Sequence, residues 1–375
     1  MSSIKEGFGL EVSSYNSREK AMGEAGMASV NRIGPSLPNP SKTAFNEKTS
    51  FSATFDTDVD YLQDDLTSNR TTSFIIPDIA LNFQTRWPLN VGAYYRQRFH
   101  RNYTIEPLVK ADPDVAESFT TEGGIFELAT TVAYAPKPFL ALALGYHFLL
   151  GRERTIESAA FNQNPNNDDT YNSKNLNGDT VSTRSRGNYP SASVTFRQKS
   201  FSLAASATLA TSLDRTFTRS ISNISSSEQS GDTRDLPWTL QVGGAFKPRQ
   251  NQTIVADFAY EAWDNAYSEL LNPAMRMGAG YEFQGNGTAY EAYYRKVAYR
   301  GGVGIERLYL DETNHYFATL GAGLPLGRRG NLFDIALKYG HRGQLENSLW
   351  SEDYLQLSVT LTGVSVWGQP VRKRR

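Results

Sequence analysis

The chain has 375 residues, of which 38 are basic and 39 acidic, so its formal net charge is −1. This balance provides no global positive field for nucleic acid, which is therefore not an expected partner. The absence of cysteine excludes thiolate catalysis, thiolate metal sites and disulfide bonds, and no apolar run approaches the roughly 18 residues that a spanning helix needs.

The first 47 residues differ from the rest of the chain. Residues 21–39, AMGEAGMASVNRIGPSLPN, are rich in Gly, Ala, Ser and Pro and have no sustained alternation. We therefore expect residues 1–47 to form no strand of a regular sheet. Residues 1–10 contain no apolar core of signal-peptide length. An exported protein would then be a mature form behind an added start, and the alternative is that the chain is not exported.

Alternation of apolar and polar residues begins near residue 48 and continues to residue 363. In the last segment, Leu355, Leu357, Val359 and Leu361 alternate with Gln356, Ser358, Thr360 and Thr362. A period of two gives an extended strand one apolar and one polar face. The pattern predicts about fourteen strands, near 48–61, 71–86, 89–103, 123–135, 138–153, 184–198, 201–216, 235–247, 252–263, 273–284, 296–310, 314–325, 331–341 and 352–363.

The predicted connections alternate between tight and mostly long ones, and the long ones span residues 104–122, 154–183 and 217–234. An even number of amphipathic strands with this asymmetry is typical of a transmembrane antiparallel β-barrel. Tryptophan supports it, because Trp87 and Trp367 fall at one predicted rim and Trp238, Trp263 and Trp350 at the other. A soluble β-sandwich is the alternative, although its loops need not alternate in length.

The barrel hypothesis divides the chain into three parts. Residues 48–363 form the wall, residues 364–375 a basic periplasmic tail, and both termini face the periplasm. About fourteen strands leave a lumen that either conducts or is occupied. Residues 1–47 suit a luminal plug, or hatch.

Several short motifs resemble the FadL/TodX-type outer-membrane transporters of long-chain fatty acids and aromatic hydrocarbons. These motifs are residues 7–10 followed by residues 21–28, then Asn39-Pro40-Ser41, and glycine-rich segments at 299–302, 321–326 and 339–343. The resemblance implies a smaller, divergent branch of that superfamily, in the outer membrane of a Gram-negative cell. It also implies a hatch that includes Gly23, Gly26, Asn39, Pro40 and Ser41, with Ser41 where the family has alanine.

The resemblance implies a passive channel for hydrophobic small molecules such as fatty acids, without a cofactor. The bilayer and a hydrophobic ligand are then the expected partners. Two departures keep an alternative open, because residues 371–375 are basic rather than ending on an aromatic residue, and relatives of this branch include non-transporters. The alternative is a binding or assembly platform for protein partners, related to secretion and engaged by the outer loops.

In the family, a ligand leaves sideways where a strand is kinked. Pro77 lies inside a predicted strand and lacks a ladder donor, so it is a candidate wall opening, with a rim bulge as the alternative. Gly301 and Gly302 are a second candidate, with crowded packing as the alternative.

Charges of both signs are predicted on the inner face. They usually pair into ladders that hold the wall and the plug. Arg96 and Arg98 could instead contact a ligand carboxylate. The predicted inward charges are Asp78, Arg96, Arg98, His100, Glu127, Asp257, Glu261, Arg276, Glu282, Arg300, Glu306, Asp334 and Lys338.

Enzyme activity is not expected. The four histidines have no metal-ligand spacing, and nucleophile-elbow and phosphate-loop motifs are absent. A membrane-embedded hydrolase would need a serine and a histidine in contact on the outer half of the wall. Asp168, Asp169 and Asp179 could bind calcium, but their spacing fits a plain surface loop better.

Overall fold

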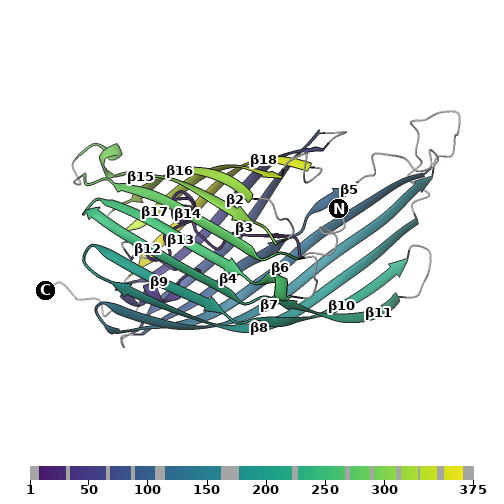
Figure 1. Ribbon diagram of the computed structural model, residues 1–375, viewed down its shortest axis with the longest axis horizontal. Helices are drawn as coiled ribbons and strands as arrows, with labels where there is room; N and C mark the ends of the chain where they lie inside the picture. The colour runs from purple at the N-terminus through teal and green to yellow at the C-terminus, as the bar shows by residue number, and fades with distance from the viewer. Residues whose placement is uncertain are drawn as a thin grey trace.

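The computed structural model describes residues 8–30, 34–64, 68–85, 89–105, 115–161, 177–221, 227–266, 271–287, 291–309, 314–327, 330–343 and 350–365. The strands form one closed antiparallel barrel (Figure 1). The first and last wall strands, β2 (Thr49–Asp64) and β18 (Trp350–Ser365), pair along their whole length and close the ring. The predicted all-β barrel is therefore confirmed.

The wall has fourteen strands, as expected from the alternation. Three of them are interrupted, so that β4 continues as β5, β9 as β10, and β11 as β12. The remaining bounds are β3 (Ser68–Gln84), β4 (Leu89–His100), β5 (Tyr103–Ile105), β6 (Val115–Lys137), β7 (Leu140–Phe161), β8 (Asn177–Arg197), β9 (Phe201–Thr208), β10 (Thr211–Ile221), β11 (Ser227–Leu236), β12 (Thr239–Arg249), β13 (Gln252–Glu261), β14 (Ala274–Gln284), β15 (Ala298–Arg307), β16 (Asn314–Leu326) and β17 (Asn331–Gly343).

Each wall strand presents large apolar side chains outward and small or polar ones inward. In β7, Leu144 is 70% exposed, while Ala141 on the other face is fully buried. In β18, Leu357 is exposed and Ser358 is buried. An apolar outer surface around a polar interior is the arrangement of a barrel whose solvent is lipid.

The two ends of the barrel differ. Short connections join β6 to β7, β8 to β9, β12 to β13 and β16 to β17 at one end, which we call the tight-turn end. At the opposite end, the long-connection end, β6, β7, β8, β10 and β11 continue past the rest of the wall (Figure 1). Much of the predicted loops 154–183 and 217–234 is therefore strand. Their polar residues alternate without an apolar face, so the sequence pattern did not reveal them.

Short elements accompany the wall. They are β1 (Leu10–Glu11), α2 (Ser17–Lys20), and the 3-10 turns η1 (Pro40–Phe45), η3 (Trp263–Asn265) and η4 (Tyr293–Lys296). None of the helices among the described residues has the length and apolar composition that crossing a bilayer requires.

Trp238 and Trp263 both lie at the predicted rim, but only one of them is exposed there. Trp238 is exposed at the long-connection end, as an interfacial residue should be. Trp263 lies at the same end but is fully buried among other aromatic rings, so it is a packing residue. Trp350 begins β18, and Trp87 and Trp367 lie outside the described residues.

Candidate functional site

The lumen contains the amino-terminal segment, by which we mean the described residues 8–30 and 34–48. It starts beside Tyr309 at the long-connection end and reaches Asn90, at the tight-turn end of β4. Most of its residues are buried. The site is therefore an interface between this segment and the inner wall.

Backbone meets backbone at the centre of this interface. Gly23 has a φ of 72°, which favours glycine, and a Cβ there would lie 2.4 Å from the carbonyl oxygen of Val303. On the wall, a Cβ on Gly302 would lie 2.2 Å from the nitrogen of Gly23. Glycines on both sides therefore allow a contact that side chains would prevent.

Buried ion pairs link the segment to the wall. The Arg18 guanidinium donates two hydrogen bonds to the Glu282 carboxylate, at 2.9 and 3.0 Å. Glu282 also accepts from Arg300, whose guanidinium lies 2.7 Å from the Asp334 carboxylate. A further pair joins Lys20 to Asp56. Removing one partner of a buried ion pair typically destabilises a protein by about 3–5 kcal/mol, because the other charge is left buried and unpaired. Each pair therefore resists movement of the segment away from the wall.

A second set of contacts surrounds the turn after α2. Glu24 accepts a 3.1 Å hydrogen bond from Lys338 and lies 3.4 Å from Arg276. Asp257 accepts from the Tyr15 hydroxyl and from the backbone nitrogens of Gly26 and Met27, at 2.8–3.0 Å. These wall carboxylates and cations thus act as partners of the segment.

Asn39, Pro40 and Ser41 are placed against β8. The Asn39 amide donates to the Met27 carbonyl and to the Thr195 hydroxyl, both at 2.8 Å. The Ser41 hydroxyl donates to the Asn39 side chain at 2.6 Å, and Pro40 begins the turn η1. Serine in place of the alanine expected by resemblance therefore adds a hydrogen bond.

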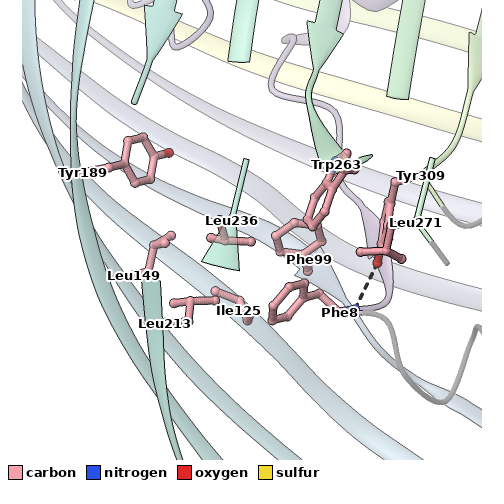
Figure 2. Close-up of a cluster of buried hydrophobic side chains, with 10 residues drawn as sticks. All are labelled: Phe8, Phe99, Ile125, Leu149, Tyr189, Leu213, Leu236, Trp263, Leu271 and Tyr309. Carbon is pink, nitrogen blue, oxygen red and sulfur yellow. Dashed lines mark hydrogen bonds between the residues drawn. The ribbon is translucent and has the colours of Figure 1, made fainter. Parts of the chain in front are cut away.

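An apolar cluster occupies the lumen at the long-connection end (Figure 2). Phe8 packs against Phe99 and Trp263, with ring centroids 5.6 and 6.0 Å apart. The Phe8 nitrogen donates to the Tyr309 hydroxyl at 3.0 Å, and that hydroxyl donates to the Gly9 carbonyl at 2.6 Å. The other members are Ile125, Leu149, Tyr189, Leu213, Leu236 and Leu271. The amino-terminal segment therefore fills this apolar part of the lumen with the Phe8 side chain.

The hollows inside and outside the wall differ in chemistry. Two apolar hollows of about 570 and 830 Å³ are lined mainly by outward-facing side chains, including Leu144 and Met277. Inside, a hollow of about 440 Å³ lies between the segment and the wall. Its lining is strongly charged and includes Glu24, Asp58, Asp60, Glu306, Arg276, Lys338 and Arg342.

The wall is discontinuous beside Pro77. The β3–β4 ladder runs from Gln84 to Asp78, which pairs with Arg96, and no farther. The β2–β3 register also shifts across Pro77. Beyond Arg96, β1 takes the place of β3, because Leu10 pairs with His100 on β4. We call this place, where β3 leaves β4, the seam.

The other predicted opening is wrong. Gly301 and Gly302 pair with β14 on one side and with β16 on the other, and both ladders continue beyond them. Gly302 faces the amino-terminal segment and Gly301 faces outward. The crowded-packing alternative therefore holds for Gly302.

Arg96 and Arg98 contact protein carboxylates. Arg96 donates to Glu11 and to the Val12 carbonyl, at 3.0 and 2.9 Å. Arg98 is buried, 4.0 Å from Glu127 and over the Tyr189 ring. Both guanidiniums therefore have partners within the chain, as expected if the inward charges pair to hold the wall and the plug.

Three adjacent strands bring together a serine, a histidine and a carboxylate. His147 Nε2 lies 2.8 Å from Ser191 Oγ, and His147 Nδ1 lies 2.8 Å from Glu127 Oε1. Glu127 also accepts from the Tyr189 hydroxyl. The sequence did not reveal this group, because strand register alone makes the three residues neighbours. The adjacent hollow holds only about 50 Å³, the space of one or two waters.

A family model described as BamG matches residues 6–372, which is nearly the whole chain. The chain belongs to the BamG family. Among curated proteins, none has significant sequence similarity to this BamG family member.

Solved structures share its fold. A FadL homologue from Pseudomonas aeruginosa has 11% identity and a TM-score of 0.67, and the alignment covers 96% of this chain and 100% of that one. The Ralstonia pickettii toluene transporter TbuX has 13% identity, a TM-score of 0.60 and coverage of 94% and 98%. The Pseudomonas putida toluene transporter TodX has 11% identity, a TM-score of 0.59 and coverage of 95% and 98%. The predicted likeness to FadL-type barrels is therefore confirmed for the fold.

In this BamG family member, Glu127, His147 and Ser191 are inward-facing side chains that serve as hydrogen-bond partners of one another. Among the described residues, no group of three or more His, Asp or Glu side chains could hold a metal. Asp179 pairs with Arg219, while Asp168 and Asp169 lie outside the described residues.

Proposed function

We propose that the protein is an outer-membrane channel for hydrophobic small molecules, closed by residues 1–47 as a hatch. The observation that carries this proposal is the seam, where the β3–β4 ladder ends at Asp78 and the hatch strand β1 covers the edge of β4. Residues 48–363 are then the wall, and residues 364–375 a periplasmic tail. Long-chain fatty acids and aromatic hydrocarbons are the substrate classes that we propose.

A lateral route suits such substrates physically. An apolar molecule gains about 25 cal/mol for each Å² that leaves water, so an exit into the bilayer avoids returning it to the periplasm. The exit needs a gap in the backbone ladder, since a continuous ladder blocks the wall. At the seam, the short pairing of Leu10 and Glu11 with β4 has to be released, together with the hydrogen bonds of Glu11 and Val12 to Arg96 and Arg98.

The similar barrels support this class of substrate, because two of them are described as toluene transporters. The charged lining of the 440 Å³ hollow does not suit an apolar ligand. Passage therefore requires the hatch to move away from the wall. In that state Arg96 and Arg98 would be candidates to receive a ligand carboxylate.

A disulfide staple tests the hatch and the seam together. Leu10 and His100 are cross-strand partners, which is suitable geometry for a disulfide, and the chain has no native cysteine. We expect the oxidised L10C/H100C protein in proteoliposomes to take up a radiolabelled fatty acid or toluene at least tenfold more slowly than the reduced protein. Reduction should restore the rate.

The matched control is L337C/L357C, a partner pair on the lipid face of β17 and β18. Its oxidation should leave uptake unchanged. If the oxidised L10C/H100C protein took up the probe as fast as the reduced protein, the seam would be excluded as the exit route. No uptake by the unmodified protein above empty liposomes would exclude the channel itself.

A second function is a platform for protein partners, and one observation favours it. The sheet that projects beyond the wall ends in β11, which pairs with β10 on one edge and has no ladder on the other among the described residues. Such an edge can accept a strand from another chain. Cross-links from residues 227–236 to one protein in isolated outer membranes, with no uptake of either probe, would support the platform over the channel.

A further inference from the structure

Two adjacent antiparallel strands carry the same Arg-X-Arg pattern, and the patterns meet at one arginine of each. The middle residues, Glu153 on β7 and Ser185 on β8, are buried and point inward. The arginines on either side are exposed on the outer face, and Arg152 is the direct cross-strand partner of Arg184. Because the strands are antiparallel, Arg186 lies opposite Leu150 and Arg154 lies opposite Ser182. The four arginines therefore cover about 14 Å along the strands and one strand spacing of about 4.8 Å. We call Arg152, Arg154, Arg184 and Arg186 the arginine block.

The positive charge of the block is only partly compensated within the described chain. Glu122 and Asp214 are cross-strand neighbours of Arg154 and Arg186, yet the four arginines form no ion pair with any described residue. The inward Glu153, by contrast, pairs with Arg101 at 3.1 Å. Like charges directly opposite each other on a sheet are destabilising. An external anion would therefore relieve the repulsion.

The block lies at the edge of the apolar band of the wall, with Arg186 opposite Leu150 and the other three arginines beyond it. On β7 the outward residues from Leu140 to Leu150 are apolar, and Arg152 is the next outward residue. Ten residue steps span about 34 Å along the strand, or about 26 Å along the membrane normal for a tilt of about 40°. This length matches an apolar band of about 25 Å. The arginines are thus at headgroup height, at the long-connection end.

We propose that the arginine block binds the phosphates of a membrane glycolipid of the lipid A type. Arginine presents a planar fork of donors that matches phosphate, and four guanidiniums can engage two phosphate groups. Below the block, exposed Phe148 and Leu150 continue the same lipid-facing surface. A phosphorylated lipid can therefore contact both the arginine block and the neighbouring apolar surface. Free phosphate or an acidic protein segment would contact only the arginines.

Binding of diphosphoryl lipid A to the full-length barrel tests the proposal, measured by native mass spectrometry in detergent. We expect R152Q/R184Q to bind at least tenfold more weakly than the unmodified protein. The matched control K199Q/R249Q also removes two exposed positive charges, but at the tight-turn end, and should change binding less than twofold. Lipid A without phosphates should bind at least tenfold more weakly to the unmodified protein.

Three outcomes would overturn the proposal. They are equal binding by R152Q/R184Q and the unmodified protein, equal binding of the phosphate-free lipid, and displacement of lipid A by inorganic phosphate at equimolar concentration. If R152Q/R184Q lacks the heat-resistant gel mobility of a folded barrel, the single variant R186Q replaces it. We expect about threefold weaker binding for R186Q, and unchanged binding by a folded R186Q would again reject the arginine block.

Discussion

Two neighbouring glycines in β15 have opposite surroundings. A Cβ on Gly302 would lie 2.2 Å from the Gly23 nitrogen and 2.3 Å from the Met22 carbonyl carbon, which are backbone atoms. A Cβ on Gly301 would meet no atom closer than 3.5 Å, at the end of the Leu320 side chain. An added methyl group therefore clashes with backbone at position 302 but fits at position 301.

We expect Gly302→Ala to displace the amino-terminal segment, because overpacking of this kind costs about 1–3 kcal/mol and the contacting atoms are backbone. Hydrogen exchange of residues 17–29 should become faster, while the heat-resistant mobility of the barrel is retained. Gly301→Ala is the matched control and should match the unmodified protein. Equal exchange in both variants would contradict the packing that the structure shows.

At the scale of elements, the sequence predicts the wall better than its contents. The fourteen strands were predictable because lipid on one side and a polar lumen on the other impose a period of two. Outside the membrane this contrast is lost, so the sequence pattern predicts loop at the ends of β7 and β8, where the structure has strand. Pro77 was a useful signal, because a missing donor is a local property. The Phe8–Tyr309 contact was not predictable, because it joins residues about 300 positions apart.

The projecting part of β7 and β8 should be dispensable for the barrel. Arg154 and Ser182 are cross-strand partners, so a two-residue Asn-Gly turn can replace residues 155–181. We expect this variant to keep the heat-resistant gel mobility and the β-sheet circular dichroism of the full chain, because the apolar band ends at Leu150. The control joins Leu144 to Ala192 with the same turn, which removes strand inside the band and should prevent membrane insertion. Failure of the first variant would mean that the wall depends on the projecting sheet.

At the scale of the whole molecule, the structure is a self-contained ring around a separate filling. The wall closes through the β18–β2 ladder without any residue of the amino-terminal segment. The segment is held by buried polar contacts such as Arg18–Glu282 and by apolar packing such as that of Phe8, while most large apolar side chains of the wall face outward. Charged groups that lose their partners in the lumen can be hydrated, which lowers the cost of removing the segment.

Deletion of residues 8–46 should therefore leave a folded barrel with an open aqueous lumen, as expected for a ring of about fourteen strands. In planar bilayers we expect stepwise ion conductance from the deletion variant and none from the full chain. The variant shortened at residues 155–181 is the control, since it keeps the segment and should not conduct. A deletion variant that folds but does not conduct would show that wall side chains close the lumen by themselves. Loss of heat-resistant mobility would instead show that the segment is needed for the ring to form, against its separation from the wall.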